Sequence, residues 1–147
     1  MPIATRAAEI DWEGPLASGA GTVSSGSGAL GALPVTWASR TERADGKTSP
    51  EELIAAAHSS CFAMALSLVL GENHTPPDRV VVSAVCTLDE VDGAPKMTRS
   101  ELRVRAHVEG IELADFEQQV QRAGELCPVS NALRGNVEIT VHSEMEV

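Results

Sequence analysis

One long apolar run dominates the pattern of hydrophobic and polar positions along this chain. Between Leu53 and Leu70 the only clearly polar residues are one histidine and three serines, His58, Ser59, Ser60 and Ser67. The run is preceded by a threonine and a serine, either of which can cap a helix, and by Pro50 at a first-turn position. Gly71 supplies a stop. The pattern predicts a helix over 48–71, and because it is apolar on every side we expect it to be buried.

Alternation of apolar and polar residues predicts strands on both sides of this helix. The expected strands are a hairpin over 6–24, a short strand over 34–40 that ends on Arg40, two long strands over 80–89 and 101–108, and a last strand over 137–141. Asp92-Gly93 marks the turn between the two long strands. In the second long strand one face is apolar and the other charged, as antiparallel sheets allow.

A second helix is predicted by apolar residues that recur at steps of three and four. These residues are Leu113, Phe116, Val120, Ala123 and Cys127. The stripe is amphipathic, and Pro128 ends it and can start a short turn over 129–133. The order of elements is therefore three strands, a buried helix, two strands, a helix and a strand. This order indicates an α+β fold with largely antiparallel sheets, in a single domain over 1–147.

Composition narrows the range of partners. The chain carries a formal net charge of −10, which argues against nucleic acid and anionic membrane surfaces because both require clustered Lys and Arg. The long apolar helix is Ala-rich, contains a histidine and has no basic flank, so we do not expect it to span a membrane. Residues 1–10 contain no apolar segment of the signal-peptide kind, and we expect a cytoplasmic protein.

Three cysteines are the candidates for chemistry, and their odd number argues against a disulfide scaffold. Cys61 lies in the middle of the long helix, and Cys127 lies at the end of the second helix. Cys86 lies on the apolar face of a strand, where a small buried hydrophobe is the expected role. By position alone, Cys61 and Cys127 are either inert packing residues or a reactive pair.

A reactive Cys61 requires a nearby cation, because burial raises the pKa of a thiol and a mid-helix position gains little from the helix dipole. His58 lies three residues before it on the same helical face, where a core histidine bonded to backbone is the alternative role. The nearest basic residues in sequence are Lys47, Arg43 and Arg40. Which arginine faces the thiol stays open at this point.

Two segments together resemble a known family. The stretch TSPEELIAAAHSSCFAMALSLVLGE and the stretch CPVSNAL are similar to the osmotically inducible protein C (OsmC) family, which is related to the organic hydroperoxide resistance proteins. The resemblance extends from WEG near the start to Cys-Pro-Val-Ser. It implies an intertwined homodimer that acts as a thiol peroxidase on organic hydroperoxides and hydrogen peroxide.

The resemblance also implies roles for four residues. Cys61 matches the peroxidatic cysteine, Cys127 the resolving cysteine, Glu51 the motif glutamate and Arg40 the arginine of the OsmC branch. In the hydroperoxide-resistance branch the arginine sits in the first hairpin, and here the residues around Gly19 include no arginine. No bound cofactor is implied, but an external dithiol is required, and the family suggests lipoyl groups.

Helix geometry constrains how these residues could meet. Glu51 and Cys61 are ten residues apart, so on one straight helix they are separated by roughly 15 Å. We therefore expect two chains to lie alongside each other, so that Glu51 of one chain meets Cys61 of the other. A dimer would also cover a helix that is apolar on every side.

Two other classes of function remain as alternatives. His58, Cys61 and Cys127 could supply three ligands to zinc, although structural zinc sites usually contain closer cysteine pairs. The chain could also be a non-catalytic, ligand-binding stress protein on the same fold.

Overall fold

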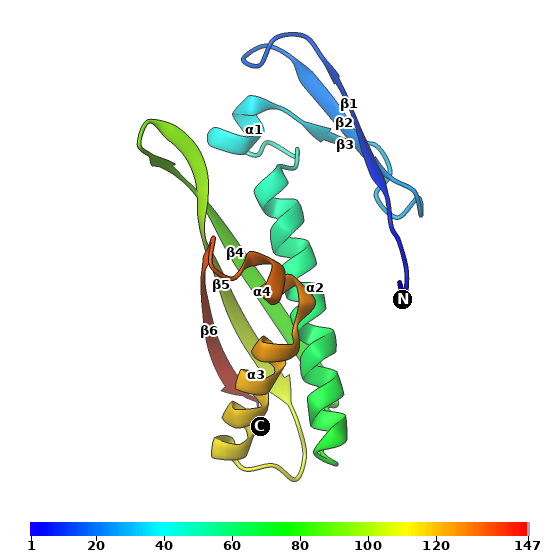
Figure 1. The fold of residues 1–147 in the computed structure, drawn as a ribbon, viewed down its shortest axis with the longest axis vertical. Helices are drawn as coiled ribbons and strands as arrows, with labels where there is room; N and C mark the ends of the chain where they lie inside the picture. Colours follow the sequence, from blue (N-terminus) through cyan, green and yellow to red (C-terminus); the bar gives the residue numbers. More distant parts are fainter. Residues whose placement is uncertain (147) are drawn as a thin grey trace. The chain divides into compact units, whose positions relative to one another are not determined.

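The chain forms two compact units, Met1–Leu53 and Ile54–Val147, in a computed structural model that describes residues 1–146 (Figure 1). The elements are β1 (Ala8–Glu13), β2 (Ala20–Ser25), β3 (Leu33–Val35), α1 (Trp37–Thr41), α2 (Pro50–Glu72), β4 (Arg79–Val91), β5 (Ala94–His107), α3 (Leu113–Leu126), α4 (Pro128–Leu133) and β6 (Glu138–Met145). This order confirms the α+β class. The expectation of a single domain over 1–147 stays a prediction, and its last residue lies outside the described range.

The first unit contains an antiparallel sheet in the order β1-β2-β3. Gly21 on β2 lies opposite Trp12 on β1, and a Cβ atom at Gly21 would come within 2.8 Å of the Trp12 ring. A glycine at this position therefore lets the indole lie across the neighbouring strand. Every residue of β1 is exposed, including Ile10 and Trp12, so apolar side chains lie at the surface of this sheet.

The prediction of a third strand over 34–40 is only partly correct. Only Leu33–Val35 is extended, and the chain then turns into the short helix α1, which carries Arg40 in its last turn. The physical reason is a capping box. The Thr36 hydroxyl accepts from the Ser39 N–H at 3.0 Å, and the Thr36 N–H donates to the Ser39 hydroxyl at 2.9 Å. Arg40 is therefore held on a helix and not at the end of a strand.

Helix α2 confirms the predicted helix and runs one residue past Gly71. The expectation that it is buried on every side is wrong for the single chain. Phe62 and Leu66 are fully buried against the second unit's core, whereas Met64 and Leu68 expose 68% and 56% of their surface. By length and composition α2 could cross a membrane, a test that the core helix of a soluble protein also passes.

The second unit contains a sheet in the order β4-β5-β6. Strands β4 and β5 form the predicted antiparallel hairpin, whose turn places Asp92 and Gly93 at φ of 52° and 80°. Strand β6 pairs with β5 in parallel, which the crossover through α3 and α4 makes possible. The sheets are thus largely antiparallel, as expected, with one parallel pair.

The core of the second unit joins α2, β5 and α3. Its fully or nearly fully buried members include Phe62 and Leu66 from α2, Leu102 and Val104 from β5, and Phe116 and Ala123 from α3. Cys127 closes the α3 stripe inside this core, as its spacing predicts, and Cys61 packs against it. The core therefore brings two sulfur-bearing segments together that are far apart in sequence.

Candidate active site

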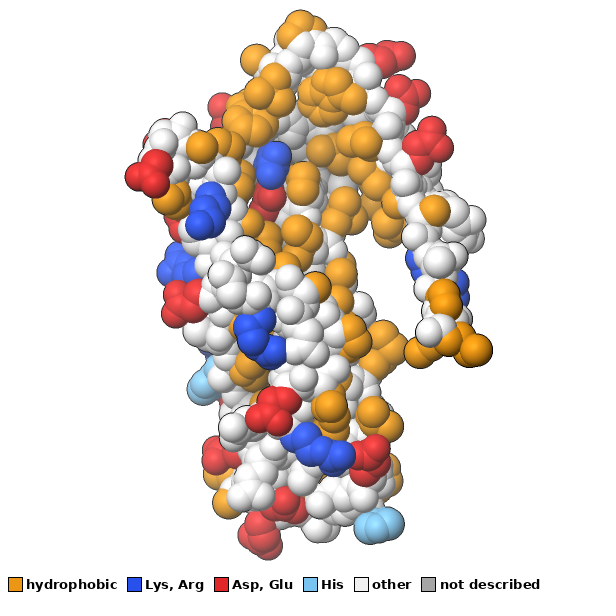
Figure 2. All heavy atoms as spheres, viewed as in Figure 1, with side chains coloured by type: hydrophobic (Ala, Val, Ile, Leu, Met, Phe, Trp, Pro, Cys, Tyr) orange, Lys and Arg blue, Asp and Glu red, His pale blue; other side chains and the backbone are white. Residues whose placement is uncertain are grey.

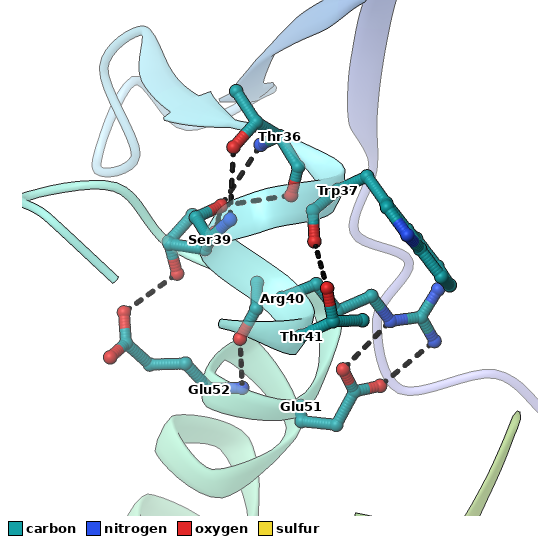
Figure 3. A network of polar contacts seen from close by, with 9 residues as sticks. Thr36, Trp37, Ser39, Arg40, Thr41, Glu51 and Glu52 are labelled. Carbon is teal, nitrogen blue, oxygen red and sulfur yellow. Dashed lines mark hydrogen bonds and ion pairs between the residues drawn. The ribbon is translucent and has the colours of Figure 1, made fainter. Parts of the chain in front are cut away.

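The first unit contains a two-pronged ion pair between Arg40 of α1 and Glu51 of α2 (Figure 3). Arg40 Nε donates to Glu51 Oε1 at 2.8 Å, and Arg40 Nη2 donates to Glu51 Oε2 at 3.0 Å. In this bidentate geometry the planar guanidinium matches the carboxylate. The two hydrogen bonds fix the orientation of the guanidinium, which a monodentate contact would leave free to rotate.

The environment of the Arg40 guanidinium keeps it charged. The hydrogen bond to Glu51 raises the pKa of Arg40, although partial burial acts in the opposite direction. The guanidinium carbon also lies 5.9 Å from the centre of the Trp37 ring, within cation–π range. Arg43, the other arginine considered above, lies in the exposed loop after α1. Of the two, Arg40 is the one whose side chain is fixed by a carboxylate.

Helix α2 and the α3–α4 junction of the second unit carry the two candidate thiols. Cys61 is half-buried on α2, and Cys127 is fully buried between α3 and α4. The Cys61 thiol lies beside the Cys127 thiol and close to the backbone N–H of Val129. All three cysteines are free thiols in this structure. The predicted meeting of Cys61 and Cys127 is therefore observed within one chain.

The surroundings of Cys61 within this unit favour its protonated form. Burial raises its pKa, the backbone N–H of Val129 opposes that effect by favouring the thiolate, and Cys127 adds to the increase. A thiol of raised pKa is a poor nucleophile near neutral pH. Reactivity at Cys61 would therefore require an additional positive charge beside it.

His58 is the polar residue of α2 whose contacts differ most from expectation. It is fully buried, but its partners are two serine hydroxyls and not backbone groups. Its Nδ1 lies 2.7 Å from Ser100 Oγ on β5, and its Nε2 lies 2.7 Å from Ser130 Oγ on α4. Burial lowers the pKa of His58, which favours the neutral imidazole. Such a ring donates through one nitrogen and accepts through the other.

The zinc alternative finds no support in this geometry. Within residues 1–146, no three His, Cys, Asp or Glu side chains are grouped so that they could hold a metal ion. Both His58 nitrogens are already occupied by hydroxyl groups, which leaves no free lone pair for a metal.

The structure thus brings the four predicted site residues together as two pairs. Arg40 meets Glu51 in the first unit, and Cys61 meets Cys127 in the second. Sequence reasoning missed Ser100 and Ser130 as partners of His58. A signal for Ser100 was present, because it occupies an inward-facing position in the alternation that continues through Leu102 and Val104.

Comparison with known proteins places the chain in a family. The family model described as "OsmC-like protein" matches residues 43–142, which is more than half of the chain. The chain belongs to the OsmC family. This confirms the resemblance noted in the sequence.

Individual relatives agree with this membership. The OsmC-family chain is 40% identical to "Peroxiredoxin OsmC" of Escherichia coli K12 over 131 residues, covering 89% of this chain and 91% of the relative. It is 33% identical to "Organic hydroperoxide resistance protein OhrA" of Bacillus subtilis over 103 residues, 69% of this chain and 71% of that one. The crystal structure of an organic hydroperoxide resistance protein OsmC from Legionella pneumophila matches with a TM-score of 0.74 at 26% identity, covering all of both chains.

Proposed function

We propose that this OsmC-family protein is a cysteine-based peroxidase that reduces organic hydroperoxides and hydrogen peroxide in oxidative stress defence. The observation that carries the proposal is the contact between the Cys61 and Cys127 thiols, from segments 66 residues apart in sequence. Two free thiols in contact are the arrangement that a peroxidatic and resolving pair requires. The names of the relatives, a peroxiredoxin and hydroperoxide resistance proteins, point to the same reaction.

The active form that we propose is a homodimer in which Arg40 and Glu51 of one chain approach Cys61 of the other. Two features support this arrangement. The first is uncovered apolar surface on the sheet of the first unit and along α2, visible as hydrophobic side chains in Figure 2. The second is the position of Glu51 at the start of α2, ten residues and roughly 15 Å of helical rise before Cys61.

The reaction then has three steps. The Cys61 thiolate, stabilised by the Arg40 guanidinium, attacks one oxygen of the peroxide bond. The O–O bond breaks, Cys61 becomes a sulfenic acid, and the other oxygen leaves as an alcohol or water after taking up a proton. Cys127 condenses with the sulfenic acid to give a disulfide and water, and an external dithiol reduces that disulfide.

Glu51 has a positioning role in this scheme. Its carboxylate holds the guanidinium at Nε and Nη2, so that the remaining N–H groups of Arg40 are free to face a thiolate and a peroxide oxygen. For the physiological reductant we propose a dithiol such as a lipoyl group, with no bound cofactor and no metal. A cytoplasmic location, without nucleic acid or membrane partners, remains part of the proposal.

The pH dependence should reveal the contribution of Arg40. The nucleophile is the thiolate, so the rate constant for the reaction with peroxide rises with pH and levels off above the pKa of Cys61. Replacing Arg40 by methionine removes the cation and leaves burial as the largest influence, which raises that pKa. We therefore expect the rate profile of Arg40→Met to be displaced to higher pH.

This displacement is measured by stopped-flow peroxide reaction across pH, together with the ultraviolet absorbance of the thiolate. Arg43→Met is the matched control, because Arg43 is the neighbouring arginine of the exposed loop. An unchanged profile in Arg40→Met, or an equal displacement in Arg43→Met, would refute the assignment of Arg40.

The role of Cys127 should be visible in a single turnover. Without a resolving thiol, Cys61 can be oxidised but cannot form the disulfide, so Cys127→Ser is expected to consume about one equivalent of peroxide and then stall as a sulfenic acid, which a second equivalent oxidises to sulfinic acid. Mass spectrometry after one equivalent of peroxide should show a Cys61–Cys127 disulfide in the wild-type protein. Absence of that disulfide from the wild-type protein would count decisively against the proposed scheme.

A further inference from the structure

A buried network of hydrogen bonds connects side chains of the second unit, and His58 lies at its centre. The imidazole connects three elements, since His58 belongs to α2, Ser100 to β5 and Ser130 to α4. Each serine makes one further hydrogen bond in this network. On one side the Cys86 thiol donates to Ser100 Oγ at 3.6 Å, and on the other the Ser130 N–H donates to Cys127 Sγ at 3.4 Å. The hydrogen-bond network therefore ends at Cys86 on the Ser100 side and at Cys127 on the Ser130 side.

The hydrogen bonds that link His58 to Cys127 run through the first turn of α4. Cys127 is at once the last cap of α3 and the first cap of α4, with its sulfur accepting the Ser130 N–H. The same turn places the Val129 N–H near the Cys61 thiol. A helix of six residues has little stability of its own, so its position depends on tertiary contacts. The hydrogen bond between His58 Nε2 and the Ser130 hydroxyl is such a contact, and it is fully buried.

His58 also lies three residues, just under one turn, before Cys61 on α2. The imidazole thus connects the helix that carries one thiol to the turn that follows the other. The His58 imidazole does not act as a base for either thiol, because both of its nitrogens are hydrogen-bonded to serine hydroxyls. Its effect on the thiols would act through position alone.

We propose that His58 is a positioning residue for the second step of the reaction, acting through Ser130 to hold the Cys127 sulfur against Cys61 while the disulfide forms. The inference rests on the proposed peroxidase function. In that step the Cys127 sulfur attacks the sulfenic sulfur of Cys61, an S–S bond forms and the S–O bond breaks. Hydroxide leaves and combines with the proton released by the Cys127 thiol to give water, so Cys127 is oxidised and the sulfenic sulfur is reduced.

The two serines provide a matched pair of variants. Ser130→Ala and Ser100→Ala each remove one buried hydroxyl and one hydrogen bond to the same imidazole, but only Ser130 adjoins Cys127. We expect Ser130→Ala to slow disulfide formation by about tenfold or more, because misplacing a reacting group by a fraction of an ångström is costly. Oxidation of Cys61 by peroxide should change less than about threefold. Ser100→Ala should leave both steps within about twofold of wild type.

Variants of His58 itself give a second, independent comparison. The side-chain amide of glutamine extends to the place of the imidazole Nε2, which faces Ser130, whereas the shorter amide of asparagine occupies the place of Nδ1, which faces Ser100. His58→Gln should therefore retain fast disulfide formation, and His58→Asn should lose it. This comparison keeps the proposal testable if Ser130→Ala fails to fold.

The two steps are separated by rapid-quench mass spectrometry of Cys61 after one equivalent of peroxide, with the melting temperature of each variant recorded beside it. A general loss of packing would slow both steps or affect both serine variants alike. Equal rates of disulfide formation in Ser130→Ala and Ser100→Ala, or in His58→Gln and His58→Asn, would overturn the proposal. Failure of the peroxidase function itself would be evident first, as a wild-type protein that forms no disulfide, and the inference would then fall with it.

Discussion

Replacing Cys61 by serine is expected to abolish peroxide reduction. A hydroxyl at this position is not ionised near neutral pH and cannot become a sulfenic acid, so both the nucleophile and the intermediate are lost. We expect the rate with either an alkyl hydroperoxide or hydrogen peroxide to fall by about 10³-fold or more, as it does when other enzymes lose their nucleophile. A steady-state assay with both peroxides and an external dithiol measures the change.

Cys86→Ser is the matched control for this prediction. Cys86 is also half-buried in the second unit, but its thiol donates to the Ser100 hydroxyl and does not pair with another thiol. Its replacement should leave peroxide reduction close to wild type. Full activity in Cys61→Ser, or equal losses in the two variants, would mean that the chemistry does not depend on Cys61. The chain would then be better described as a non-catalytic member of the family.

Mixing the inactive Cys61→Ser variant with the impaired Arg40→Met variant should raise activity near neutral pH if the site is shared between chains. In the proposed dimer, a Cys61→Ser chain still supplies Arg40, and an Arg40→Met chain still supplies Cys61. A mixed dimer therefore contains one complete site and one site that lacks both groups. Because one of its two sites is complete, the purified mixed dimer should recover about half of wild-type activity, and an unfractionated mixture, in which random pairing makes half of the dimers mixed, about one quarter.

The experiment uses co-expressed chains with different tags, so that the mixed dimer can be purified and its mass checked by light scattering. A double variant that carries both substitutions in one chain, mixed with wild type, controls for simple dilution. No recovery in a confirmed mixed dimer would show that Arg40 acts on the thiol of its own chain. A stable, active monomer at low concentration would rule out the shared site altogether.

Periodicity in the sequence was sufficient to predict the longer elements. The α2 run, the β4–β5 hairpin with its Asp92-Gly93 turn and the apolar stripe of α3 each repeat a simple spacing over many residues. Helix α1 was missed because it has only five residues, and because its capping box uses Ser39 where a glutamate or glutamine is more usual. The parallel pairing of β6 could not be predicted, since alternation identifies a strand but not its neighbour.

The candidate site was predictable only in part, for a related reason. The motif around Cys61 and the Cys-Pro-Val-Ser segment were sufficient to predict which two cysteines form the candidate pair. The contact between the Cys61 and Cys127 thiols, however, depends on how α3 packs against α2. The partners of His58 lie 42 and 72 residues away along the chain, and a single histidine gives no indication of them. Burial of α2 was overestimated because apolar character does not reveal whether the covering surface belongs to the same chain.

The ion pair between Arg40 and Glu51 has a consequence for the speed of each catalytic cycle. Immobilising a long arginine side chain costs up to about 2 kcal/mol of conformational entropy. Here the carboxylate already holds the guanidinium within one folded unit, before any peroxide arrives. In the proposed mechanism that entropy is lost once, when the chain folds, and not again at each turnover. The charge beside the thiolate is therefore preorganised, and little reorganisation remains for the moment of attack.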